Sequence, residues 1–322
     1  MWKFALRRFL LMIPQIVILS VVVFFLTELM PGDALTGLID QNWSDEMIEI
    51  QRELLGLNNP WYVRYWDWIT GIILRGDFGN SHRYGMPVIR VIGQRLGNTI
   101  RLSITTLIFL YIIAIPLGII SGRHHDTWKD RIITYYTYLG FGMPSFILAL
   151  LALFYFGFML GWFPTGLSVT PGLTSQDGLA FHLSRLHHVI LPALTVALIS
   201  NVAIIQYLRG EIIDTEQKEF VQMARAKGSD ESRVYNKHIL RNSLLPIASF
   251  VGFQLAGVIG GSIFIETIFS FPGIGELSIN AIIGRDFTLM TALILMFSSA
   301  TILGSFLSDL IMMFVDPRIE IE

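Results

Sequence analysis

The chain has 322 residues, of which 53% are hydrophobic and 15% are charged, and its mean hydropathy is +0.58. The charged fraction is far below the roughly 25% of soluble globular proteins, which argues against a soluble two-domain protein. A net charge of −2 provides no basic field for nucleic acid. The absence of cysteine excludes disulfides, thiol nucleophiles and thiolate metal sites.

Long uncharged windows separate the few charged residues. A membrane-spanning helix needs about 20 apolar residues, because all its backbone polar groups must be satisfied within the segment. Each window is long enough to hold one such helix, and we therefore predict an all-α polytopic membrane protein with six transmembrane helices. The windows are 9–27, 102–122, 132–176, 186–208, 242–265 and 287–308.

The first window, which follows three basic residues, resembles a secretory signal. Its apolar run continues to Met30 without an Ala-x-Ala type cleavage site, and it is longer than the 7 to 15 residues typical of a signal peptide. We therefore expect an uncleaved first span.

Basic residues indicate the orientation of the spans, since they favour the cytoplasmic side of short loops. With the N-terminus inside, fourteen of the 23 Lys and Arg residues are cytoplasmic, and seven of these lie in 209–241. The two short outer loops carry only Arg185 and Arg285. We predict that both termini are cytoplasmic.

The organisation expected along the chain has three parts. Residues 1–30 form a cytoplasmic N-terminus and the first span, and 31–98 form an extracytoplasmic segment with interfacial helices. In that segment, Trp61, Tyr62, Tyr65, Trp66 and Trp68 recur at helical spacing and favour a helix in the lipid headgroup region over an aromatic ligand site. Residues 99–322 form a five-helix core, with spans at about 101–122, 132–160, 187–208, 246–268 and 287–315 and a coupling loop at 209–246.

The sequence contains none of the motifs of a P-loop, a serine hydrolase, a zinc protease or a dinucleotide-binding site. No Gly-Lys pair occurs, so any ATP that drives this protein must be hydrolysed by another chain. We expect no catalytic residue. His182, His187 and His188 are spaced so that two imidazoles could approach a transition metal, but histidines that finish a helix at the interface are the more common case, and we predict no metal site.

Neutral polar residues occupy mid-depth positions of the predicted spans, where charged groups are costly. Such residues suit a passage for polar solutes, and they suit interhelical hydrogen bonds equally well. The candidates for the pathway lining are Asn201, Gln254, Ser298 and Ser299.

The segment 214–246, which we call the elbow, is expected to form two short helices on the cytoplasmic side, between the fourth and fifth spans. Asp214 or Thr215 is the predicted cap of the first helix, Gly228 ends that helix, and Ser229 caps the second. Such an elbow can enter a groove of another protein and tilt as a lever. An ordinary solvated loop is the alternative.

The elbow resembles the EAA-type coupling loop of permease subunits in binding-protein-dependent ABC importers. The matching residues are Glu219, ARAKG at 224–228 and RNSLLP at 241–246. Further motifs resemble the dipeptide, oligopeptide and nickel permease family, in the position of its "B" subunit. These motifs are MPGD at 30–33, LGL at 55–57, GDFG at 76–79, ILPA at 190–193, Glu266, FPGIG at 271–275, RD at 285–286 and DPR at 316–318. Ala34, Ser229 and Phe271 depart from the family pattern and leave the subfamily open.

The resemblance implies a transport subunit, not an enzyme, in a bacterial or archaeal cytoplasmic membrane. This subunit would form half of the translocation pathway for dipeptides or oligopeptides. Its expected partners are membrane lipid, a second homologous permease in a heterodimer, two ABC ATPases that hold ATP and Mg, and an extracytoplasmic solute-binding protein; the chain itself would bind no cofactor. The residues implied to couple to the ATPases are Glu219, Ala224, Arg225, Ala226, Lys227 and Gly228.

Two alternatives stay open. The same architecture could import nickel or another small solute, because specificity in this family rests largely with the binding protein. A secondary transporter is a more distant alternative. It would need inverted repeats and either ion-coupling acids or broken helices near the midplane, and neither the repeats nor the acids are evident in the sequence.

Overall fold

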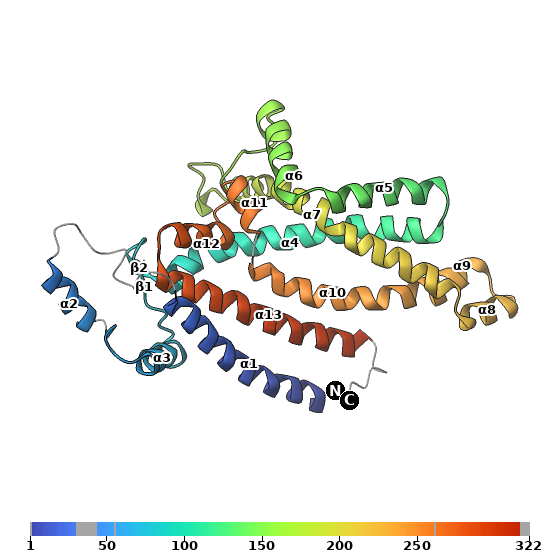
Figure 1. Cartoon of the computed structure of the whole chain (residues 1–322). Helices are drawn as coiled ribbons and strands as arrows, with labels where there is room; N and C mark the ends of the chain where they lie inside the picture. Colours follow the sequence, from blue (N-terminus) through green and yellow to red (C-terminus); the bar gives the residue numbers. More distant parts are fainter. Residues whose placement is uncertain (1, 30–43, 55, 261, 316–322) are drawn as a thin grey trace.

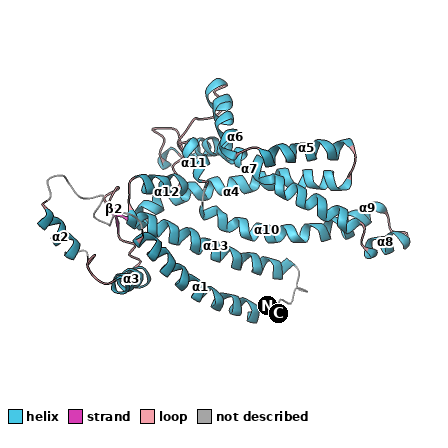
Figure 2. Ribbon diagram, viewed as in Figure 1, coloured by secondary structure: helices cyan, strands magenta, loops and turns pink. Residues whose placement is uncertain are grey.

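The computed structural model describes residues 2–29, 44–54, 56–260 and 262–315, which form helices and one short antiparallel hairpin (Figures 1 and 2). In the hairpin, Asn80 pairs with Pro87 and Ser81 with Met86. The MPGD motif at 30–33 and the DPR motif at 316–318 lie outside the described residues.

The elements follow one another as α1 (Trp2–Glu28), α2 (Asp45–Leu54), α3 (Trp61–Thr70), η1 (Gly71–Arg75), β1 (Asn80–Ser81), β2 (Met86–Pro87), α4 (Val88–Arg123), α5 (Trp128–Gly142), α6 (Ser145–Ala152), η2 (Leu153–Met159), η3 (Ser175–Asp177), α7 (Leu179–Glu216), α8 (Glu219–Ala226), α9 (Glu231–Arg233), η4 (Val234–Leu240), α10 (Arg241–Gly260), α11 (Ile263–Ile268), α12 (Ile274–Ile283) and α13 (Phe287–Val315).

Four helices among the described residues are long and apolar enough to cross a membrane, namely α1, α4, α7 and α13. A fifth candidate is the pair of α5 with α6 and η2, which bends by 101°. Pro144 explains the bend, because it lacks an N–H and holds Met143 in an extended conformation with ψ of 117°. The segment 132–160, expected as one helix, is thus two helices at a steep angle. The window 242–265 contains most of α10.

Several helices are longer than the spans predicted within them. α4 begins at Val88 instead of about 101, and α7 covers Leu179–Glu216 instead of about 187–208. Hydropathy marks where a helix leaves lipid, whereas a helix continues for as long as its backbone hydrogen bonds do. α13, at Phe287–Val315, coincides with the range 287–315.

The long helices pack around α7. α4 lies along α7, α5 and α6 also contact it, and α10 connects this group to α13, against which α1 packs (Figure 1). Gly118 and Gly122 allow the close approach of α4, because a Cβ atom at these positions would lie 3.0 Å from Leu208 and 2.8 Å from Ile212 of α7. Small residues four apart are a common device at helix interfaces in membranes.

The bundle has two distinct ends (Figure 1). α8 and α9 project from the end at which α1 begins and α13 finishes, and we call this the elbow end. The hairpin, α11 and α12 lie at the opposite end, which we call the hairpin end.

Candidate functional site: the elbow between α7 and α10

The elbow is built of α8, α9 and η4 between the end of α7 and the start of α10. α7 continues through Asp214 and Thr215, and the amides of Gln217 and Lys218 close it by donating to the carbonyls of these two residues. Neither Asp214 nor Thr215 therefore caps the first elbow helix, which begins at Glu219.

The turn after α8 depends on Gly228, which has a φ of +72°. This left-handed conformation costs an ordinary residue about 1–2 kcal/mol. The amide of Ser229 donates back to the carbonyl of Ala224 at 3.3 Å, so Ser229 still belongs to the closure of α8. The cap of the next helix is consequently Asp230, whose carboxylate accepts from the amide of Ser232 at 3.0 Å, and not Ser229 as the sequence suggested.

α8 has one buried face and one exposed face. Val221 and Ala224 are buried in a hydrophobic core that also includes Ile212 of α7, Val234 of η4 and Ile247 of α10. The elbow is thus packed into the helix bundle and is not a solvated loop. Four residues that could meet another protein are exposed, namely Glu219, Met223, Ala226 and Lys227.

Arg225 forms ion pairs with two carboxylates of the elbow. Its guanidinium lies 2.8 Å from the carboxylate of Glu216 at the end of α7 and 2.6 Å from that of Glu231 in α9. Hydrogen bonds from Arg225 lower the pKa of Glu231, and the two carboxylates raise the pKa of Arg225. These contacts hold α8 between its two neighbours.

A second set of contacts joins the elbow to α4. The guanidinium of Arg123, the last residue of α4, lies over the ring of Tyr235 at 4.6 Å from the ring centroid. Tyr235 is 6% exposed, and this burial raises the pKa of its hydroxyl. The cytoplasmic elbow expected from the sequence is therefore in contact with α4 as well as with α7.

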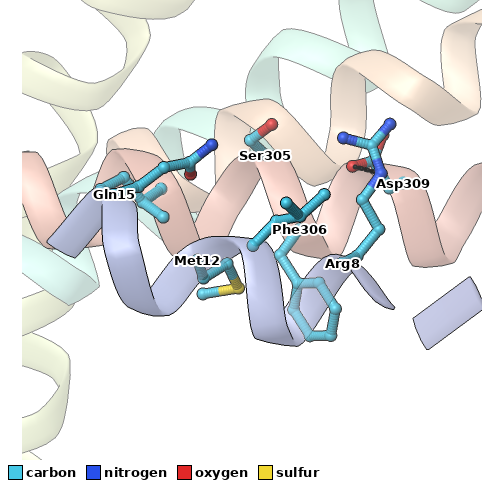
Figure 3. Close-up of a pocket in the computed structure, with 8 residues that line it drawn as sticks. Arg8, Met12, Gln15, Ser305, Phe306 and Asp309 are labelled. Carbon is cyan, nitrogen blue, oxygen red and sulfur yellow. Dashed lines mark ion pairs between the residues drawn. The ribbon is translucent and has the colours of Figure 1, made fainter. Parts of the chain in front are cut away.

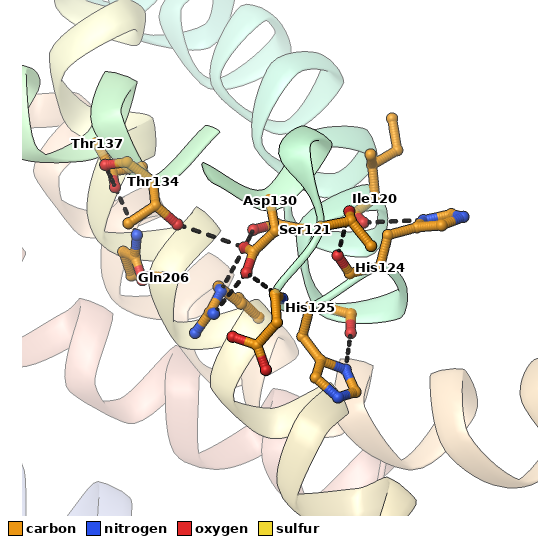
Figure 4. Close-up of polar contacts among 12 residues, drawn as sticks. Ile120, Ser121, His124, His125, Asp130, Thr134, Thr137 and Gln206 are labelled. Atoms are coloured by element: carbon orange, nitrogen blue, oxygen red, sulfur yellow. Dashed lines mark hydrogen bonds and ion pairs between the residues drawn. The ribbon is translucent and has the colours of Figure 1, made fainter. Parts of the chain in front are cut away.

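A buried ion pair next to the elbow joins α5 to α7 (Figure 4). Nε and Nη2 of Arg209 each lie 2.7 Å from a carboxylate oxygen of Asp130, which is 3% exposed. Ser121 donates a further hydrogen bond to this carboxylate, and the amide of Asp126 donates another at 2.9 Å. α4, the loop after it, α5 and α7 therefore meet at one carboxylate.

The structure separates the residues implied to couple to the ATPases into two groups. Ala224 is buried and Arg225 is engaged by two carboxylates, so these two residues hold the elbow together. Glu219, Ala226, Lys227 and Gly228 are exposed. Met223, an exposed apolar residue, was not predicted, because a single methionine in a helix carries no signal of its own. The pairing of Asp130 with Arg209 was not predicted either, because the two residues are 79 positions apart.

The candidate pathway residues do not lie together in one place. Asn201 is fully buried and accepts a hydrogen bond from the hydroxyl of Tyr136 at 2.9 Å, between α5 and α7. Gln254 accepts from Tyr111 at 2.7 Å, between α10 and α4. Both therefore make the interhelical bonds that were the alternative to a pathway lining. Ser298 and Ser299 are partly buried on α13.

Two carboxylates next to the spans form ion pairs with arginines. Glu28 of α1 forms an ion pair with Arg64 of α3. Asp309 of α13 lies 3.3 Å from Arg8 of α1, beside a small pocket that Gln15 and Ser305 also line (Figure 3).

Glu266 of α11 is fully buried at the hairpin end. Its carboxylate accepts a hydrogen bond from the Thr99 hydroxyl at 2.9 Å and one from the amide of Glu276 at 3.1 Å. The Thr99 hydroxyl in turn accepts from the amide of Ile274 at 2.7 Å. Glu266 thereby fixes α11 and α12 against α4.

Two of the candidate metal histidines are engaged by backbone carbonyls. Nε2 of His187 lies 2.8 Å from the carbonyl of Trp162, and Nδ1 of His188 lies 2.7 Å from that of Ser184. In the described part of the chain, no three His, Asp or Glu side chains are grouped as they would be around a metal ion.

Bundled apolar helices, several of them long enough to cross a membrane, define a polytopic membrane protein with a packed elbow at one end. Comparison with known families assigns it more closely. Residues 114–321 match the family described as the inner membrane component of binding-protein-dependent transport systems, and residues 1–103 match the N-terminal region of such components. The chain belongs to this family, and it is a transport component and not an enzyme.

Full-length relatives support the assignment. The chain is 34% identical to the oligopeptide transport system permease protein AppB of Bacillus subtilis, over 99% of this chain and 100% of that protein. It is 32% identical to the dipeptide transport system permease protein DppB of Alkalihalophilus pseudofirmus, over 99% and 100% of the two chains. It is also 32% identical to the glutathione transport system permease protein GsiC of Salmonella choleraesuis, over 99% of each.

A solved structure shares the fold. A chain of the MetNI methionine ABC transporter, in an inward-facing conformation, superposes with a TM-score of 0.55 at 14% identity. The similarity covers 71% of this chain and 97% of that chain.

Proposed function

We propose that this chain is one of two transmembrane subunits of an ATP-driven importer of peptides. The carrying observation is the exposed face of α8, with Glu219, Met223, Ala226 and Lys227, on an elbow held by Arg225. In this proposal a cytoplasmic ATPase binds that face. A displacement of α8 would be transmitted to α7 through the ion pair of Arg225 with Glu216. It would be transmitted to α4 through the contact of Tyr235 with Arg123.

The substrate follows from the relatives, whose names refer to oligopeptides, dipeptides and glutathione. We infer that a solute-binding protein delivers a short peptide to the hairpin end of a heterodimer of this chain and a homologous permease. The relatives' organisms support placement in a bacterial or archaeal cytoplasmic membrane. ATP and Mg would be held by two ATPase subunits.

The proposed membrane arrangement has six spans with both termini in the cytoplasm. It is supported by the positive-inside distribution and by the position of the start of α1 and the end of α13 at the elbow end (Figure 1). Because the chain has no cysteine, single variants Lys227→Cys and Asn59→Cys can be tested with a membrane-impermeant thiol reagent. In right-side-out vesicles Asn59→Cys should react and Lys227→Cys should not; the reverse pattern contradicts the orientation.

A substitution on the exposed face of α8 tests the coupling role. Ala226→Glu places a charge at the proposed contact, while Asn59→Glu makes a matched change at an exposed position before α3. Ala226→Glu should abolish co-purification with the ATPases and ATP-dependent uptake at unchanged membrane levels, and Asn59→Glu should preserve both. Unchanged uptake by Ala226→Glu would reject the proposal.

The substrate class needs a separate experiment. Proteoliposomes that contain the whole transporter and its cognate binding protein should take up radiolabelled di- or oligopeptides when ATP is supplied. Uptake of nickel but not of peptides would favour the metal-importing alternative, and uptake driven by an ion gradient without ATP would favour a secondary transporter.

The pathway lining is proposed for Ser298 and Ser299, with Asn201 and Gln254 as residues that shape it from their interhelical positions. The half-buried position of the two serines on α13 supports this assignment. Thiol modification of Ser298→Cys and Ser299→Cys should become slower when peptide and binding protein are present. Modification at the same rate in both conditions would contradict the assignment.

A further inference from the structure

The aromatic helix α3 lies across α1 at the hairpin end. Figure 1 shows α3 almost along its own axis, whereas α1 runs across the page. α3 continues into η1, and together they cover Trp61–Arg75. A helix that crosses a membrane span in this way runs close to the plane of the membrane.

The contacts between α3 and α1 set the depth at which α3 lies. The Tyr65 hydroxyl lies 2.8 Å from the Ser20 hydroxyl, while Arg64 forms its ion pair with Glu28, the last residue of α1. Ser20 and Glu28 are eight residues apart, or about 12 Å along the helix axis at 1.5 Å per residue. α3 therefore lies beside the last turns of α1 and not beyond its end. This is the depth of the boundary between headgroups and hydrocarbon in a bilayer that α1 spans.

Aromatic contacts fix the face that α3 turns toward α1. The ring of Phe24 lies 5.6 Å from that of Tyr65 and 5.8 Å from that of Trp68, between centroids. The ring of Phe25 lies 4.9 Å from that of Trp61. These contacts bind α3 to the span and determine which side chains face away.

The side chains that face away form an apolar stripe. Tyr62, Trp66 and Ile73, at positions i, i+4 and i+11 of a helix, are 58%, 65% and 71% exposed, and the neighbouring Leu74 is 79% exposed. Tyr and Trp combine an apolar ring with one polar atom, which suits the membrane interface. We call Tyr62, Trp66, Ile73 and Leu74 the α3 stripe.

We propose that the α3 stripe is a lipid-binding surface, which anchors α3 and η1 in the headgroup region of the leaflet at the hairpin end. Lipid is favoured over a protein partner because α3 packs on α1, whose own surface carries exposed apolar side chains, among them Ile18 and Leu26 at 64% and 52%. The anchor braces the outer end of α1 against tilting. It extends beyond the proposed transport function, since it requires only that α1 crosses a bilayer.

Spin labelling tests the proposal, because the wild-type chain has no cysteine to replace. Single variants Tyr62→Cys, Trp66→Cys and Ile73→Cys are labelled with a nitroxide and reconstituted as the whole transporter in phospholipid bilayers. Collisions with oxygen, which concentrates in lipid, are compared with collisions with a water-soluble nickel chelate. Ile18→Cys is the lipid control, Asn59→Cys the aqueous control, and the complex with the unsubstituted chain gives the background.

Labels on the stripe should collide more often with oxygen than with the nickel chelate, as the label at Ile18→Cys does. The oxygen preference should be smaller than at Ile18→Cys, because the stripe lies less deep in the bilayer. Asn59→Cys should show the opposite preference. A preference for the nickel chelate at all three stripe positions would place the helix in water and overturn the proposal. Low collision rates with both reagents would show a protein partner over the stripe and would overturn it as well.

Discussion

Arg209 of α7 holds both carboxylate oxygens of Asp130 of α5, each at 2.7 Å. Figure 4 shows the polar contacts around Asp130. The geometry is bidentate, which adds directional specificity to the charge interaction. Because Ser121 of α4 and the amide of Asp126 donate to the same carboxylate, movement of α7 must carry α4 and α5 with it.

Breaking this pair should destabilise the protein. Asp130→Asn leaves the Arg209 guanidinium without its counter-charge, and we expect a loss of about 3 kcal/mol, the lower end of the range for a broken buried pair. The lower end applies because the Arg209 side chain is 25% exposed. Thermal unfolding of the protein in nanodiscs measures the loss. The double variant Asp130→Asn with Arg209→Leu should recover part of it, and an equal loss in the single and double variants would contradict this explanation.

Gly228 should tolerate no side chain, for conformational reasons alone. A Cβ atom there meets nothing within 4 Å, but the φ of +72° is unfavourable for any other L-residue. Gly228→Ala should cost about 1–2 kcal/mol locally and reduce ATPase binding and uptake. Gly210→Ala, at a helical glycine that also has open space, is the matched control and should leave both unchanged. Equal effects of the two substitutions would refute the role of the turn.

The ion pairs of Arg225 predict a pH dependence of the elbow. The pKa of Glu231 is lower in the folded chain than its ordinary value of 4.5, so its charged form is the one that folding stabilises. Its contribution is therefore complete above about pH 4.5 and is lost as the pH falls through the lowered pKa. Hydrogen exchange of the α8 amides measures this contribution. At pH 7 the α8 amides of Glu231→Gln should exchange faster than those of the wild type.

The difference between Glu231→Gln and wild type should shrink as the pH falls below 4.5. Glu219→Gln provides the control, since Glu219 is an exposed carboxylate at the start of α8, the helix whose exchange is measured. It should leave the exchange of α8 close to that of wild type at both pH values. A difference between Glu231→Gln and wild type that stays constant with pH would contradict the assignment to this carboxylate.

Thr99 should be needed for the packing of α11 and α12 at the hairpin end. Its hydroxyl donates to Glu266 and accepts from the amide of Ile274, so Thr99→Val leaves two buried groups without this partner. We expect a loss of about 1–3 kcal/mol in thermal or denaturant unfolding. Thr105→Val is the matched control, because the Thr105 hydroxyl bonds only to the Arg101 carbonyl in its own helix. It should have a much smaller effect, and a loss as large as that of Thr99→Val would contradict the prediction.

Local sequence patterns predicted part of the structure of the elbow. Gly228 and the charges around α8 were sufficient to predict a helix, a turn and a second helix, because caps and left-handed turns are decided by a few neighbouring residues. The predicted cap of the second helix, Ser229, was wrong: the amide of Ser229 closes α8, and Asp230 caps α9. The roles within α8 could not be predicted, because burial of Ala224 and pairing of Arg225 depend on α7 and α9.

Composition and charge spacing alone determined that this chain is an apolar, helical membrane protein, since the cost of burying charge in lipid acts on every segment independently of its neighbours. The motifs along the chain also determined its family. Only the tertiary structure decided that Asn201 and Gln254 bond to tyrosines of other helices, and that Arg209 meets Asp130. These features join residues far apart in the sequence, and their partners are selected by how the helices pack.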